Sequence, residues 1–595
     1  MNKKFILLRE LYQNNTDKNK ICFTYSITFS EYEKLLLELK NVDLYVNKEN
    51  NTLTESGIKY LNEHKVERAV ILASGLGKRM GDASVETSKC LLKVKNEVLV
   101  ERLITQLKEK GIDDIVVLVG YVKEQFYYLK DKYNVTLVEN KDFRDKNTIA
   151  SFYNVISYLQ DKNTYIVVGD IYLEKNIFNK YEIDPYYLGV WLDDCTGEWI
   201  FNYDDDCKVS GVTLNGMYDY FLGGFSFHTK DFINKLIELV KKRIKEDNSD
   251  GLYWEEVLVE NFDKLPNFFI RKIHAGILYE FDTQEDLDKI KDDSVLVKSK
   301  LKEVFEIKND NFSLEKISEG INNNTYLLNY DNKKYIVRKP GVATGIFIDR
   351  KKEKEIYDVL NKTNLADKVV YFDEETGFKI TEYYENSKTI NKTVETELSD
   401  ALKAYKQLHC LNLKVNKDIN IVNVLKDYID IMKKQKISFL YGNFEEIVEK
   451  CDRIDKYIQK FNRPSMLTHG DAGHGNVLCT GDGTKIIDFE FAGMADPITD
   501  IALFGVFDEL DIDKILDLFD IYKNIKVDNE EVLKLDSLNP DETKNLLVSY
   551  IAIDAIACVV WNLIKTTVTG KYLDGYSERR LQLFDNCIKY LAKVI

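Results

Sequence analysis

The stretch Leu467–Asp500 constrains the fold of this chain most, because its polar side chains stand at fixed spacings around two short apolar runs. The runs Val477–Cys479 and Ile486–Ile487 predict two strands, and Gly481-Asp482-Gly483 predicts the turn between them. The polar residues on either side of this hairpin are His469, Asp471, Asn476 and Asp488. A polar loop therefore precedes the hairpin, and an aspartate follows it.

An aspartate, an asparagine five residues later and a second aspartate after a strand form the arrangement of a kinase catalytic loop. On this interpretation Asp471 orients the attacking hydroxyl, while Asn476 and Asp488 hold the Mg²⁺ that bridges the phosphates of ATP. Each residue alone fits a surface turn equally well, since Asp and Asn are common in turns. The complete set in order favours a phosphotransferase site.

The loop has His-Gly-Asp where protein kinases have His-Arg-Asp. In this it resembles the small-molecule kinases of the choline and aminoglycoside kinase superfamily. The run IDFEFAGMADPITDIA, which starts at Ile487, resembles choline/ethanolamine kinases, where an acidic residue two past the metal-binding aspartate is typical; here it is Glu490. The resemblance implies a bilobal, protein-kinase-like α+β domain over residues 298–595, with Glu490 on the substrate side.

Four residues ahead of this loop are candidates for nucleotide binding. Gly320 lies between strand-like runs and allows a turn that closes over ATP phosphates. Choline kinases have arginine where other kinases have the third-strand lysine, so the resemblance assigns Arg338 to this position. Glu353 is its expected helix partner, with Glu355 or a solvated helix face as the alternatives. Glu382 marks the expected hinge between the lobes.

The last helices carry candidates for substrate binding. Trp561 and Tyr576, with Arg579 nearby, resemble the aromatic choline pocket of the kinase family, and packing of a helical core stripe is the competing interpretation. We interpret His409 as structural and Asp500 as a brace for the catalytic loop.

Length, charge and cysteine content narrow the classes of protein. A chain of 595 residues is too long for one hydrophobic core. Its net charge of −16 argues against nucleic acid or an anionic membrane as the main partner. Nine scattered cysteines suit a reducing cytoplasm better than a disulfide framework or a zinc site. Asp554 interrupts the apolar run Tyr550–Ile564, so we expect a buried helix there and no membrane span.

Residues 1–66 form the first expected domain. Phe5–Tyr12 and Phe29–Leu39 predict helices, Leu44–Leu53 predicts a short two-stranded wing, and Thr54 is the candidate cap of a third helix. This order resembles a winged helix-turn-helix domain. Because glutamates outnumber lysines in the candidate recognition helix, we favour a packing, dimerising or effector-sensing role over DNA binding.

The second expected domain, residues 67–297, opens with a glycine-rich turn after the apolar run Ala69–Leu72. Glycines let backbone N–H groups approach phosphate oxygens closely, and Arg79 and Lys89 supply positive charge. The candidate nucleotide-binding residues of the turn are Gly75, Gly77 and Lys78. The Rossmann dinucleotide fingerprint is absent, since no third glycine or ribose-binding acid follows on schedule.

The complete run resembles the signature of sugar-nucleotide-type nucleotidyltransferases, which is G-x-G-x-R-M followed by a Pro-Lys pair and Leu-Leu. Ser74 stands where alanine is usual and Ser88 where the proline is usual, while the lysine is retained as Lys89. The resemblance implies catalytic roles for Arg79 and Lys89.

Apolar runs and helical stretches alternate downstream, which predicts a doubly wound, Rossmann-like parallel sheet with ligands at the carboxyl ends of its strands. Asp170 and Asp282 each follow an apolar run. By resemblance to the family they hold Mg²⁺, and capping of a strand end is the alternative. The candidates for base and ribose contacts are Asn140, Asn147, Thr148 and Ser151.

Across this domain the chain most resembles the bacterial CTP:phosphocholine cytidylyltransferases. The segments that carry the resemblance are Glu198-Trp199, Gly223-Gly224-Phe225-Ser226 and Tyr253-Trp254-Glu255. A trimethylammonium group has no hydrogen to donate, so aromatic faces and carboxylates must recognise it. Trp199, Tyr253 and Trp254 are the candidates, and a core or rim position is the alternative for each.

The two resemblances imply consecutive reactions: ATP-dependent phosphorylation of choline, followed by cytidylyl transfer from CTP to phosphocholine. The expected products are CDP-choline and pyrophosphate, the expected cofactor is Mg²⁺, and the expected location is the cytoplasm. A homo-oligomer is compatible with the sequence.

Three alternatives stay open. The first is an enzyme of the same architecture that acts on ethanolamine, another aminoalcohol or a phosphonate. A sugar kinase joined to a sugar-1-phosphate nucleotidyltransferase would need polar side chains where Trp199 and Trp254 stand. A winged-helix regulator with degenerate enzyme domains conflicts with the intact Asp471, Asn476 and Asp488.

Overall fold

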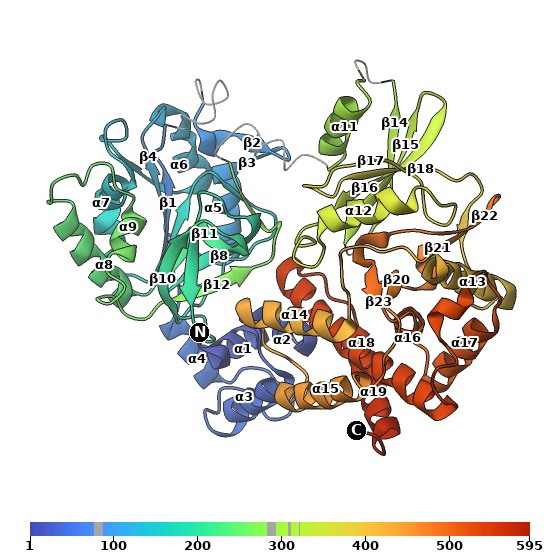
Figure 1. Ribbon diagram of the computed structural model, residues 1–595. Coiled ribbons are helices and arrows are strands. Elements are labelled where there is room, and N and C mark those ends of the chain that lie inside the picture. The colour runs from blue at the N-terminus through green and yellow to red at the C-terminus, as the bar shows by residue number, and fades with distance from the viewer. Residues whose placement is uncertain (77–86, 282–292, 308–310, 321) are drawn as a thin grey trace. The chain divides into compact units, whose positions relative to one another are not determined.

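The computed structural model describes residues 1–76, 87–281, 293–307, 311–320 and 322–595. The chain forms two compact units, Met1–Leu296 and Val297–Ile595 (Figure 1). The first contains a small helical module and a large mixed sheet. The second contains a five-stranded sheet followed by a largely helical part.

The first unit begins with the helices α1 (Lys3–Tyr12), α2 (Lys18–Tyr25), α3 (Phe29–Asn41) and α4 (Glu55–Glu63). The helices predicted at α1 and α3 are confirmed, whereas α2, which Asp17 caps, is absent from the prediction. Thr54 caps α4 as predicted, because its hydroxyl accepts a hydrogen bond from the Gly57 N–H at 3.2 Å. A bridge between Val46 and Leu53 lies where the wing is expected. The winged-helix identity of the module stays a prediction.

A nine-stranded mixed sheet forms the core of the first unit. Its strands are β1 (Arg68–Ala73), β4 (Ile115–Val119), β5 (Thr136–Glu139), β6 (Thr164–Val168), β8 (Tyr186–Asp194), β9 (Trp199–Tyr203), β10 (Val209–Leu214), β11 (Met217–His228) and β12 (Phe269–Ile273). Strands β6, β1, β4 and β5 lie side by side and run parallel, which confirms the predicted parallel sheet. Strand β11 joins β6 antiparallel and continues the sheet into a half that is antiparallel except for the parallel pair β8 and β12.

Helices and short strands complete the first unit. They are β2 (Lys93–Val94), β3 (Glu97–Val98), α5 (Leu99–Glu109), α6 (Tyr128–Tyr133), α7 (Thr148–Leu159), β7 (Ile171–Leu173), α8 (Lys230–Arg243), α9 (Trp254–Val259) and β13 (Leu278–Glu280). Leu103 and Leu107 of α5 share one apolar core with Ile71 of β1 and Val117 of β4. The helix therefore covers the parallel half of the sheet, and the glycine-rich turn follows β1 at the carboxyl end of that half.

A buried ionic contact fixes the helical module to the sheet. Arg9 on α1 is 1% exposed, and its Nη1 lies 2.5 Å from Oε2 of Glu182. Arg271 on β12 lies 3.5 Å from the other oxygen of Glu182, and the hydroxyls of Tyr165 and Tyr186 donate to that oxygen at 3.0 and 2.9 Å. Burial works to raise the pKa of Glu182, but Arg9 and Arg271 outweigh it and lower the pKa.

The second unit opens with an antiparallel sheet in the order β14, β15, β16, β18, β17. The elements of this lobe are α11 (Asp293–Val304), β14 (Ser313–Glu319), β15 (Asn323–Tyr330), β16 (Lys333–Pro340), α12 (Arg350–Leu360), β17 (Val369–Phe372) and β18 (Lys379–Glu382). Asp349 caps α12, since its carboxylate accepts a hydrogen bond from the Lys352 N–H at 3.2 Å.

The remaining elements form the second lobe of this unit. They are β19 (Lys388–Thr389), α13 (Glu395–Cys410), α14 (Ile421–Lys434), α15 (Phe444–Ile458), β20 (Met466–Thr468), β21 (Val477–Thr480), β22 (Gly483–Ile486), β23 (Gly493–Ala495), α16 (Ile498–Phe507), α17 (Ile512–Asn524), α18 (Pro540–Thr569) and α19 (Tyr576–Leu591). The predicted hairpin is confirmed, because Val477 pairs with Ile486 and Thr480 with Gly483. A sheet lobe followed by a helical lobe is the bilobal kinase-like fold expected for this half.

Helix α18 is the longest helix among the described residues. It is long and apolar enough to cross a membrane, but 94% of its most apolar window is buried inside the protein. The expectation of a buried helix around Asp554 is therefore confirmed.

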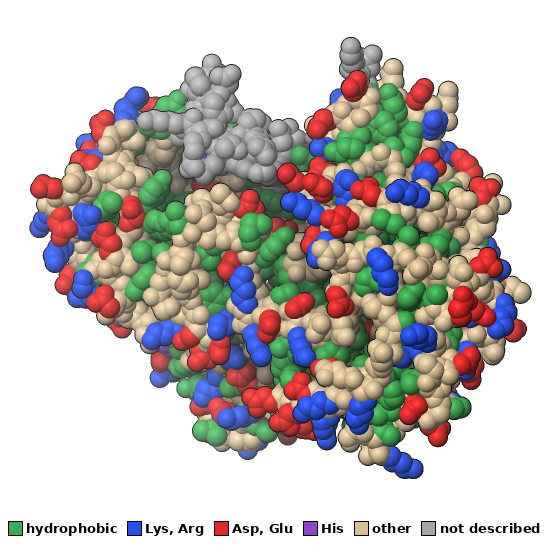
Figure 2. Space-filling model, in the orientation of Figure 1, with side chains coloured by type: hydrophobic (Ala, Val, Ile, Leu, Met, Phe, Trp, Pro, Cys, Tyr) green, Lys and Arg blue, Asp and Glu red, His purple; other side chains and the backbone are tan. Residues whose placement is uncertain are grey.

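Charged side chains of both signs are interspersed over the described residues drawn in Figure 2. Many of them form surface pairs, such as Lys18–Glu33 and Lys354–Asp358. On the face drawn, this mixture differs from the basic stripe that binding to a phosphate backbone requires.

The substitution Arg9→Met should lower the free energy of unfolding of the full chain by about 3–5 kcal/mol, because it leaves Glu182 buried opposite one remaining guanidinium. Lys18→Met, which removes the exposed pair with Glu33, is the control and should cost less than about 1 kcal/mol. Urea unfolding followed by circular dichroism measures both. Equal effects of the two substitutions would contradict the anchoring role of Arg9.

Candidate active sites

The first candidate site lies at the carboxyl end of β6. The Lys89 ammonium lies 2.8 Å from Oδ2 of Asp170, and it donates a hydrogen bond to the carbonyl of Phe281 at 3.2 Å. Strand β13 pairs with β7, and the Phe281 N–H donates to the Asp170 carbonyl at 3.3 Å. The fold thus brings Lys89, Asp170 and the chain just before Asp282 to one strand end.

Four predicted residues of this site lie outside the described residues: Gly77, Lys78, Arg79 and Asp282. Gly75, at the start of the same turn, is exposed, and a Cβ added there would meet no atom of the described residues within 4 Å. None of the described residues therefore covers the backbone at Gly75.

Asn140 and Ser151, predicted to contact base and ribose, are buried and bonded to the protein itself. The amide of Asn140 donates to the hydroxyls of Ser74 and Ser151, each at 3.2 Å. Its carbonyl oxygen accepts hydrogen bonds from the Asn154 amide and the Asp142 N–H. Asn140 and Ser151 are therefore engaged by protein groups next to the turn after β1, and their contact with a nucleotide stays a prediction.

Asn147 and Thr148 connect the start of α7 to a distant loop. Asn147 caps α7, and its amide donates to the Gly251 carbonyl at 2.9 Å. The Thr148 hydroxyl accepts a hydrogen bond from the Trp254 N–H at 3.1 Å. Both side chains are partly exposed, so they hold the loop before α9 and remain accessible beside it.

The structure separates the three aromatic candidates of this unit. Trp254 is 1% exposed and stacks on Phe152 and Tyr187, with ring centroids 5.2 and 6.1 Å apart. The prediction that its ring face receives an onium group is wrong, because neighbouring rings already cover the indole. Trp199 is partly exposed at the start of β9, and Tyr253 is 48% exposed.

Glu255 lies next to this aromatic cluster and is absent from the predicted site. The Tyr187 hydroxyl donates to its Oε1 at 3.1 Å, and its Oε2 is buried and has no hydrogen-bond partner among the described residues. Burial raises the pKa of Glu255 to about 7, although the bond from Tyr187 works to lower the pKa. The signal in the sequence is its place beside Trp254 in the Tyr-Trp-Glu segment.

The second candidate site is built around the catalytic loop of the kinase-like unit. The Asn476 amide donates to Oδ2 of Asp471 at 2.9 Å and to the Asp471 carbonyl at 2.8 Å. Asp488 begins the turn after β22 with φ of 65°, and it lines the same cavity as Asp471. Burial, and then the negative charges of Asp488 and Glu490, raise the pKa of Asp471 well above its usual range. The predicted loop residues are thus brought together.

Asp500 braces the loop that carries Asp471, as predicted, through its hydrogen bonds to the backbone. Its carboxylate accepts hydrogen bonds from the backbone N–H groups of His469 and Gly470 at 2.7 and 3.0 Å. His409 lies 2.9 Å from the same carboxylate and 2.8 Å from the Tyr522 hydroxyl. His409 is fully buried, so its structural role is confirmed.

Arg338 pairs with Glu353 as predicted, at 2.6 Å. Arg338 also lies 3.0 Å from Asp488, and Arg350 lies 2.7 Å from Glu353 and 3.2 Å from Glu490. Burial works to raise the pKa of Glu353, but the guanidinium groups lower it to about 2. A buried network of arginines and carboxylates therefore joins β16, α12 and the turn after β22.

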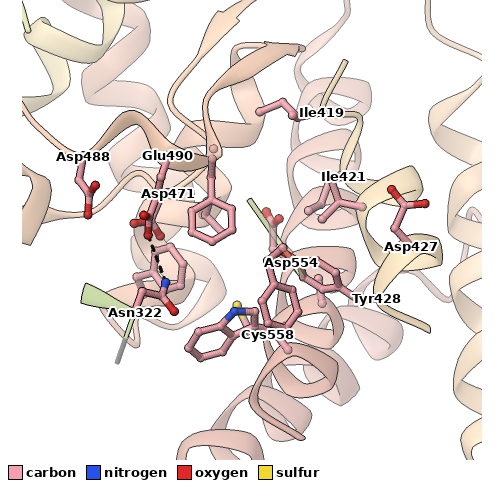
Figure 3. Close-up of a pocket in the computed structure, with 18 of the residues that line it drawn as sticks. Asn322, Ile419, Ile421, Asp427, Tyr428, Asp471, Asp488, Glu490, Asp554 and Cys558 are labelled. Atoms are coloured by element: carbon pink, nitrogen blue, oxygen red, sulfur yellow. Dashed lines mark hydrogen bonds between the residues drawn. The ribbon is translucent and has the colours of Figure 1, made fainter. Parts of the chain in front are cut away.

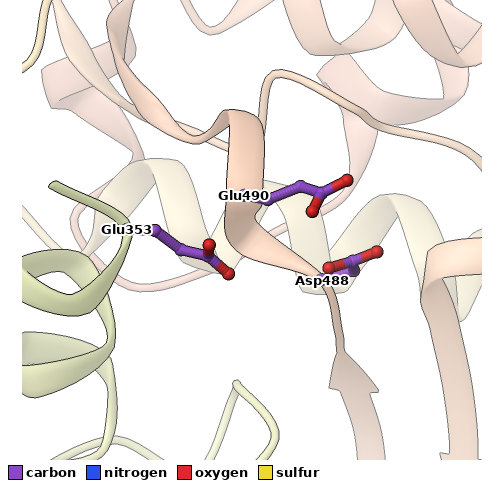
Figure 4. A group of neighbouring side chains, drawn as sticks. All are labelled: Glu353, Asp488 and Glu490. Atoms are coloured by element: carbon purple, nitrogen blue, oxygen red, sulfur yellow. The ribbon is translucent and has the colours of Figure 1, made fainter. Parts of the chain in front are cut away.

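Glu353, Asp488 and Glu490 converge closely enough to hold a metal ion, with one oxygen of each within 4.8 Å of the others (Figure 4). Glu353 and Glu490 are fully buried and face guanidinium groups, so their charge is already offset. Asp488 is 30% exposed on the cavity side. Carboxylate and amide oxygens suit Mg²⁺, so Asp488 with Asn476 fits this ion better than the arginine-bound pair does.

Beside the catalytic loop lies a cavity of about 600 Å³, drawn in Figure 3. Four aromatic rings form a continuous wall in it: Tyr428, Phe347, Trp561 and Tyr576. Successive ring centroids are 5.2, 6.2 and 6.4 Å apart. The predicted pair Trp561 and Tyr576 therefore lines a cavity that also contains Asp471.

Asp554 on α18 lines this cavity and is absent from the predicted binding residues. It is 1% exposed, and its Oδ2 has no hydrogen-bond partner in the described structure. Figure 3 shows Asp554 near Tyr428 on the side of the cavity away from Asp488. A charged residue inside the apolar run of α18 is the signal in the sequence that marks it.

The two remaining nucleotide-site candidates lie in the sheet lobe. Gly320 lines the cavity and closes the turn between β14 and β15, with its N–H donating to the Asn323 carbonyl at 2.8 Å. The neighbouring Asn322 and Asn323 amides donate to Glu490 at 3.2 and 3.1 Å. Glu382 is exposed at the end of β18 and is not among the described residues that line the cavity.

Comparison with known proteins separates the two halves of the chain. Residues 69–180 match the MobA-like NTP transferase domain, and residues 313–523 match the phosphotransferase enzyme family. A choline-phosphate cytidylyltransferase of Streptococcus pneumoniae is 36% identical over 38% of this chain and 97% of the relative. A 2-aminoethylphosphonate cytidylyltransferase of Lancefieldella rimae is 31% identical over 39% of this chain and 94% of the relative. A crystal structure of the choline kinase LicA from Streptococcus pneumoniae covers 50% of this chain and 99% of its own, with 21% identity and a TM-score of 0.42.

Glu255 should make stability depend on pH in a measurable way. Its pKa is about 7 in the folded chain against 4.5 as the ordinary value, so between these values the folded state holds the extra proton. The free energy of unfolding should therefore fall as pH rises through this window, and Glu255→Gln should remove that loss. Chemical unfolding of both proteins between about pH 5 and 8 measures the difference. Glu238→Gln on α8 is the control, and an equal pH-dependent gain there would contradict the assignment.

Proposed function

We propose that this chain, which belongs to the choline-phosphate cytidylyltransferase family through its first half and carries a domain of the phosphotransferase enzyme family in its second, makes CDP-choline from choline. The kinase half phosphorylates choline with ATP. The transferase half then joins phosphocholine to the cytidylyl group of CTP and releases pyrophosphate. The product of the first reaction is thus the substrate of the second.

The observation that carries the choice of choline is a lone carboxylate at an aromatic wall, in the cavity that contains Asp471. A trimethylammonium group is attracted by ring faces and by negative charge but donates no hydrogen bond. Asp554 is such a carboxylate, buried and with one oxygen unpartnered in the described structure. Burial, and then Asp500, raise its pKa well above the usual range, and a bound cation would favour its ionised form again.

In the kinase step, Asp471 accepts the proton of the choline hydroxyl as that oxygen attacks the γ-phosphorus of ATP. Asn476 orients Asp471 through the hydrogen bond between their side chains. Asp488 and Asn476 would hold Mg²⁺, which supplies charge neutralisation for the phosphates. Arg338 and Glu353 fix the position of the turn that carries Asp488.

In the transferase step, the phosphate of phosphocholine is already ionised at neutral pH, so it needs no general base. It attacks the α-phosphorus of CTP, and pyrophosphate leaves. Lys89 provides positive charge beside Asp170, which with Asp282 would hold Mg²⁺. Arg79, Gly77 and Lys78 complete the phosphate site in this proposal.

For the organisation of the chain we keep three domains, residues 1–66, 67–297 and 298–595. The first is a winged-helix-like module that packs on the transferase through the pair Arg9–Glu182. Trp199 and Tyr253 remain candidates for the onium group of phosphocholine, and Glu382 remains the candidate hinge. With ATP, CTP and small alcohols as its partners, the enzyme works in the cytoplasm.

An aminoalcohol with a primary ammonium is the second candidate substrate. One oxygen of Asp554 has no hydrogen-bond partner in the described structure, and this supports the second candidate. A primary ammonium donates a hydrogen bond to such an oxygen, whereas the trimethylammonium group of choline does not. A relative named for a phosphonate substrate also matches the first half. The test compares choline with ethanolamine as substrates of the kinase half, and phosphocholine with 2-aminoethylphosphonate as substrates of the transferase half. Choline and phosphocholine should give the highest kcat/KM.

Asp471→Ala should lower the kcat for choline phosphorylation by at least about 10³-fold, because the attacking hydroxyl loses its proton acceptor. It should leave turnover of phosphocholine with CTP unchanged, and Lys89→Ala should do the reverse. Product analysis with purified protein, Mg²⁺, ATP and CTP measures both reactions. Loss of both reactions in either variant would contradict independent sites.

Asp554→Asn should raise the KM for choline by about 10–100-fold, since it removes the negative charge at the aromatic wall. The KM for ATP should stay within about threefold of the wild-type value. Asp427→Asn removes an exposed carboxylate from the same cavity and is the matched control, with little effect expected because solvent screens it. Steady-state kinetics with choline and ATP varied in turn measure these constants, and an unchanged choline KM in Asp554→Asn would rule out this assignment.

A further inference from the structure

The cavity beside the catalytic loop is strongly acidic. Its described lining residues include seven acidic side chains and one basic side chain. The acidic residues are Asp418, Asp427, Asp471, Asp488, Glu490, Asp500 and Asp554, and the basic residue is Lys417. A phosphoryl group in transfer spreads negative charge over its three equatorial oxygens, so it needs positive charge in this cavity.

Arg338, the cation expected on the nucleotide side, is already engaged by protein groups. Its Nη1 lies 2.6, 3.0 and 3.5 Å from carboxylate oxygens of Glu353, Asp488 and Glu490. Its Nη2 donates to the Gly377 carbonyl at 3.1 Å. The guanidinium is buried, so its charge serves mainly to offset these carboxylates.

The backbone holds Lys417 firmly against the two loops of the site. The Lys417 carbonyl accepts a hydrogen bond from the Met494 N–H at 2.7 Å, and the Ile419 N–H donates to the Met494 carbonyl at 3.1 Å. A Cβ at Gly493 would lie 2.8 Å from the Lys417 carbonyl oxygen, and one at Gly470 would lie 2.9 Å from the Ile419 side chain. Both loops therefore need glycine where the segment crosses them, and the position of Lys417 is fixed by close packing.

Among the described residues, the ammonium of Lys417 makes one hydrogen bond. It donates to the Glu490 carbonyl at 3.2 Å, whereas an ammonium has three N–H groups. Burial lowers the pKa of Lys417 to about 8, although Glu353 and Asp349 work to raise it. A poorly solvated cation at the reaction cavity interacts strongly with a phosphate that binds there, because little water screens the two charges.

We propose that Lys417 is a catalytic residue of the kinase half, whose Nζ contacts the oxygens of the phosphoryl group during its transfer. The bond from the alcohol oxygen to the γ-phosphorus forms while the bond from that phosphorus to the β–γ bridging oxygen breaks. The bridging oxygen keeps the electron pair and leaves with ADP, and the hydroxyl proton goes to Asp471. Lys417 stays protonated throughout and neutralises charge. The inference rests on the proposed kinase function.

The test compares Lys417→Met, Lys417→Gln and Lys417→Arg in the full chain. Methionine and glutamine remove the charge, but glutamine keeps a donor for the Glu490 carbonyl, and arginine keeps the charge. We expect both neutral variants to lose about 100-fold or more in kcat for choline phosphorylation, with the KM for choline and for ATP within about threefold of wild type. Lys417→Arg should stay within about tenfold of the wild-type kcat.

A second measurement is independent of the alcohol. Mg²⁺–ADP with aluminium fluoride mimics the phosphoryl group in transfer, so its affinity by calorimetry should fall about 30-fold or more in Lys417→Gln, while the affinity for Mg²⁺–ADP stays within about threefold. If wild-type protein does not phosphorylate choline, the proposed function fails, and this comparison still decides the role of Lys417.

Lys414→Met is the matched control, because Lys414 is exposed in the same segment and donates to the Ser465 carbonyl at 2.9 Å. It should leave kcat within about twofold of wild type. Circular dichroism checks folding, and Lys417→Gln replaces Lys417→Met if the latter does not fold. The proposal is overturned if Lys417→Gln keeps wild-type kcat and affinity for the fluoride complex, or if Lys414→Met loses as much.

Discussion

The kinase-like unit depends on the pairing of buried carboxylates with a small number of fixed guanidinium groups. Glu353 and Glu490 are almost completely buried, and each faces both Arg338 and Arg350. An unpaired buried charge would cost several kcal/mol, so these groups hold one another in place. Because Glu353 lies on α12 and Glu490 on the turn after β22, the network ties the sheet lobe to the turn that carries Asp488. The carboxylates of this candidate site therefore keep their positions, because the arginines around them cannot move independently.

The same physical rule operates in the first unit. Glu182 is buried between Arg9 and Arg271, so the helical module and the mixed sheet share one charge network. At the carboxyl end of β6, Lys89 faces Asp170. One of these contacts fixes a module and the other forms part of a candidate site, yet both follow from the high cost of burying a single charge.

Against this rule, Asp554 and Lys417 stand out because neither is paired with an opposite charge in the described structure of the cavity. Asp554 lies at the aromatic wall with one oxygen unpartnered, and Lys417 lies at the loops around Glu490 with a carbonyl as its hydrogen-bond acceptor. Glu353 and Glu490 are paired with guanidinium groups, whereas Asp554 and Lys417 leave room for a ligand to complete their interactions. The cationic group of a small alcohol complements Asp554, and the phosphoryl group transferred to that alcohol complements Lys417.

Local sequence patterns determined much of what was found. The hairpin of β21 and β22, the cap at Thr54 and the parallel strands β1, β4 and β6 follow from short-range periodicity and turn chemistry. The loop with Asp471 and Asn476 was predicted from the spacing of a kinase catalytic loop. The sequence left Glu353, Glu355 and a solvated helix face open for the partner of Arg338, and the structure pairs it with Glu353.

Only the tertiary structure decided which side chains are available to a ligand. Trp254 has a suitable ring for an onium group, but Phe152 and Tyr187, which are remote in sequence, stack on it. Asn140 has a suitable amide, but that amide donates to the hydroxyl of Ser74. Asp554 and Lys417 belong to no local motif, and α18 and the segment before α14 bring them to the cavity. Burial and the pairing of charges are properties of residues that meet after folding, and a linear pattern does not record them.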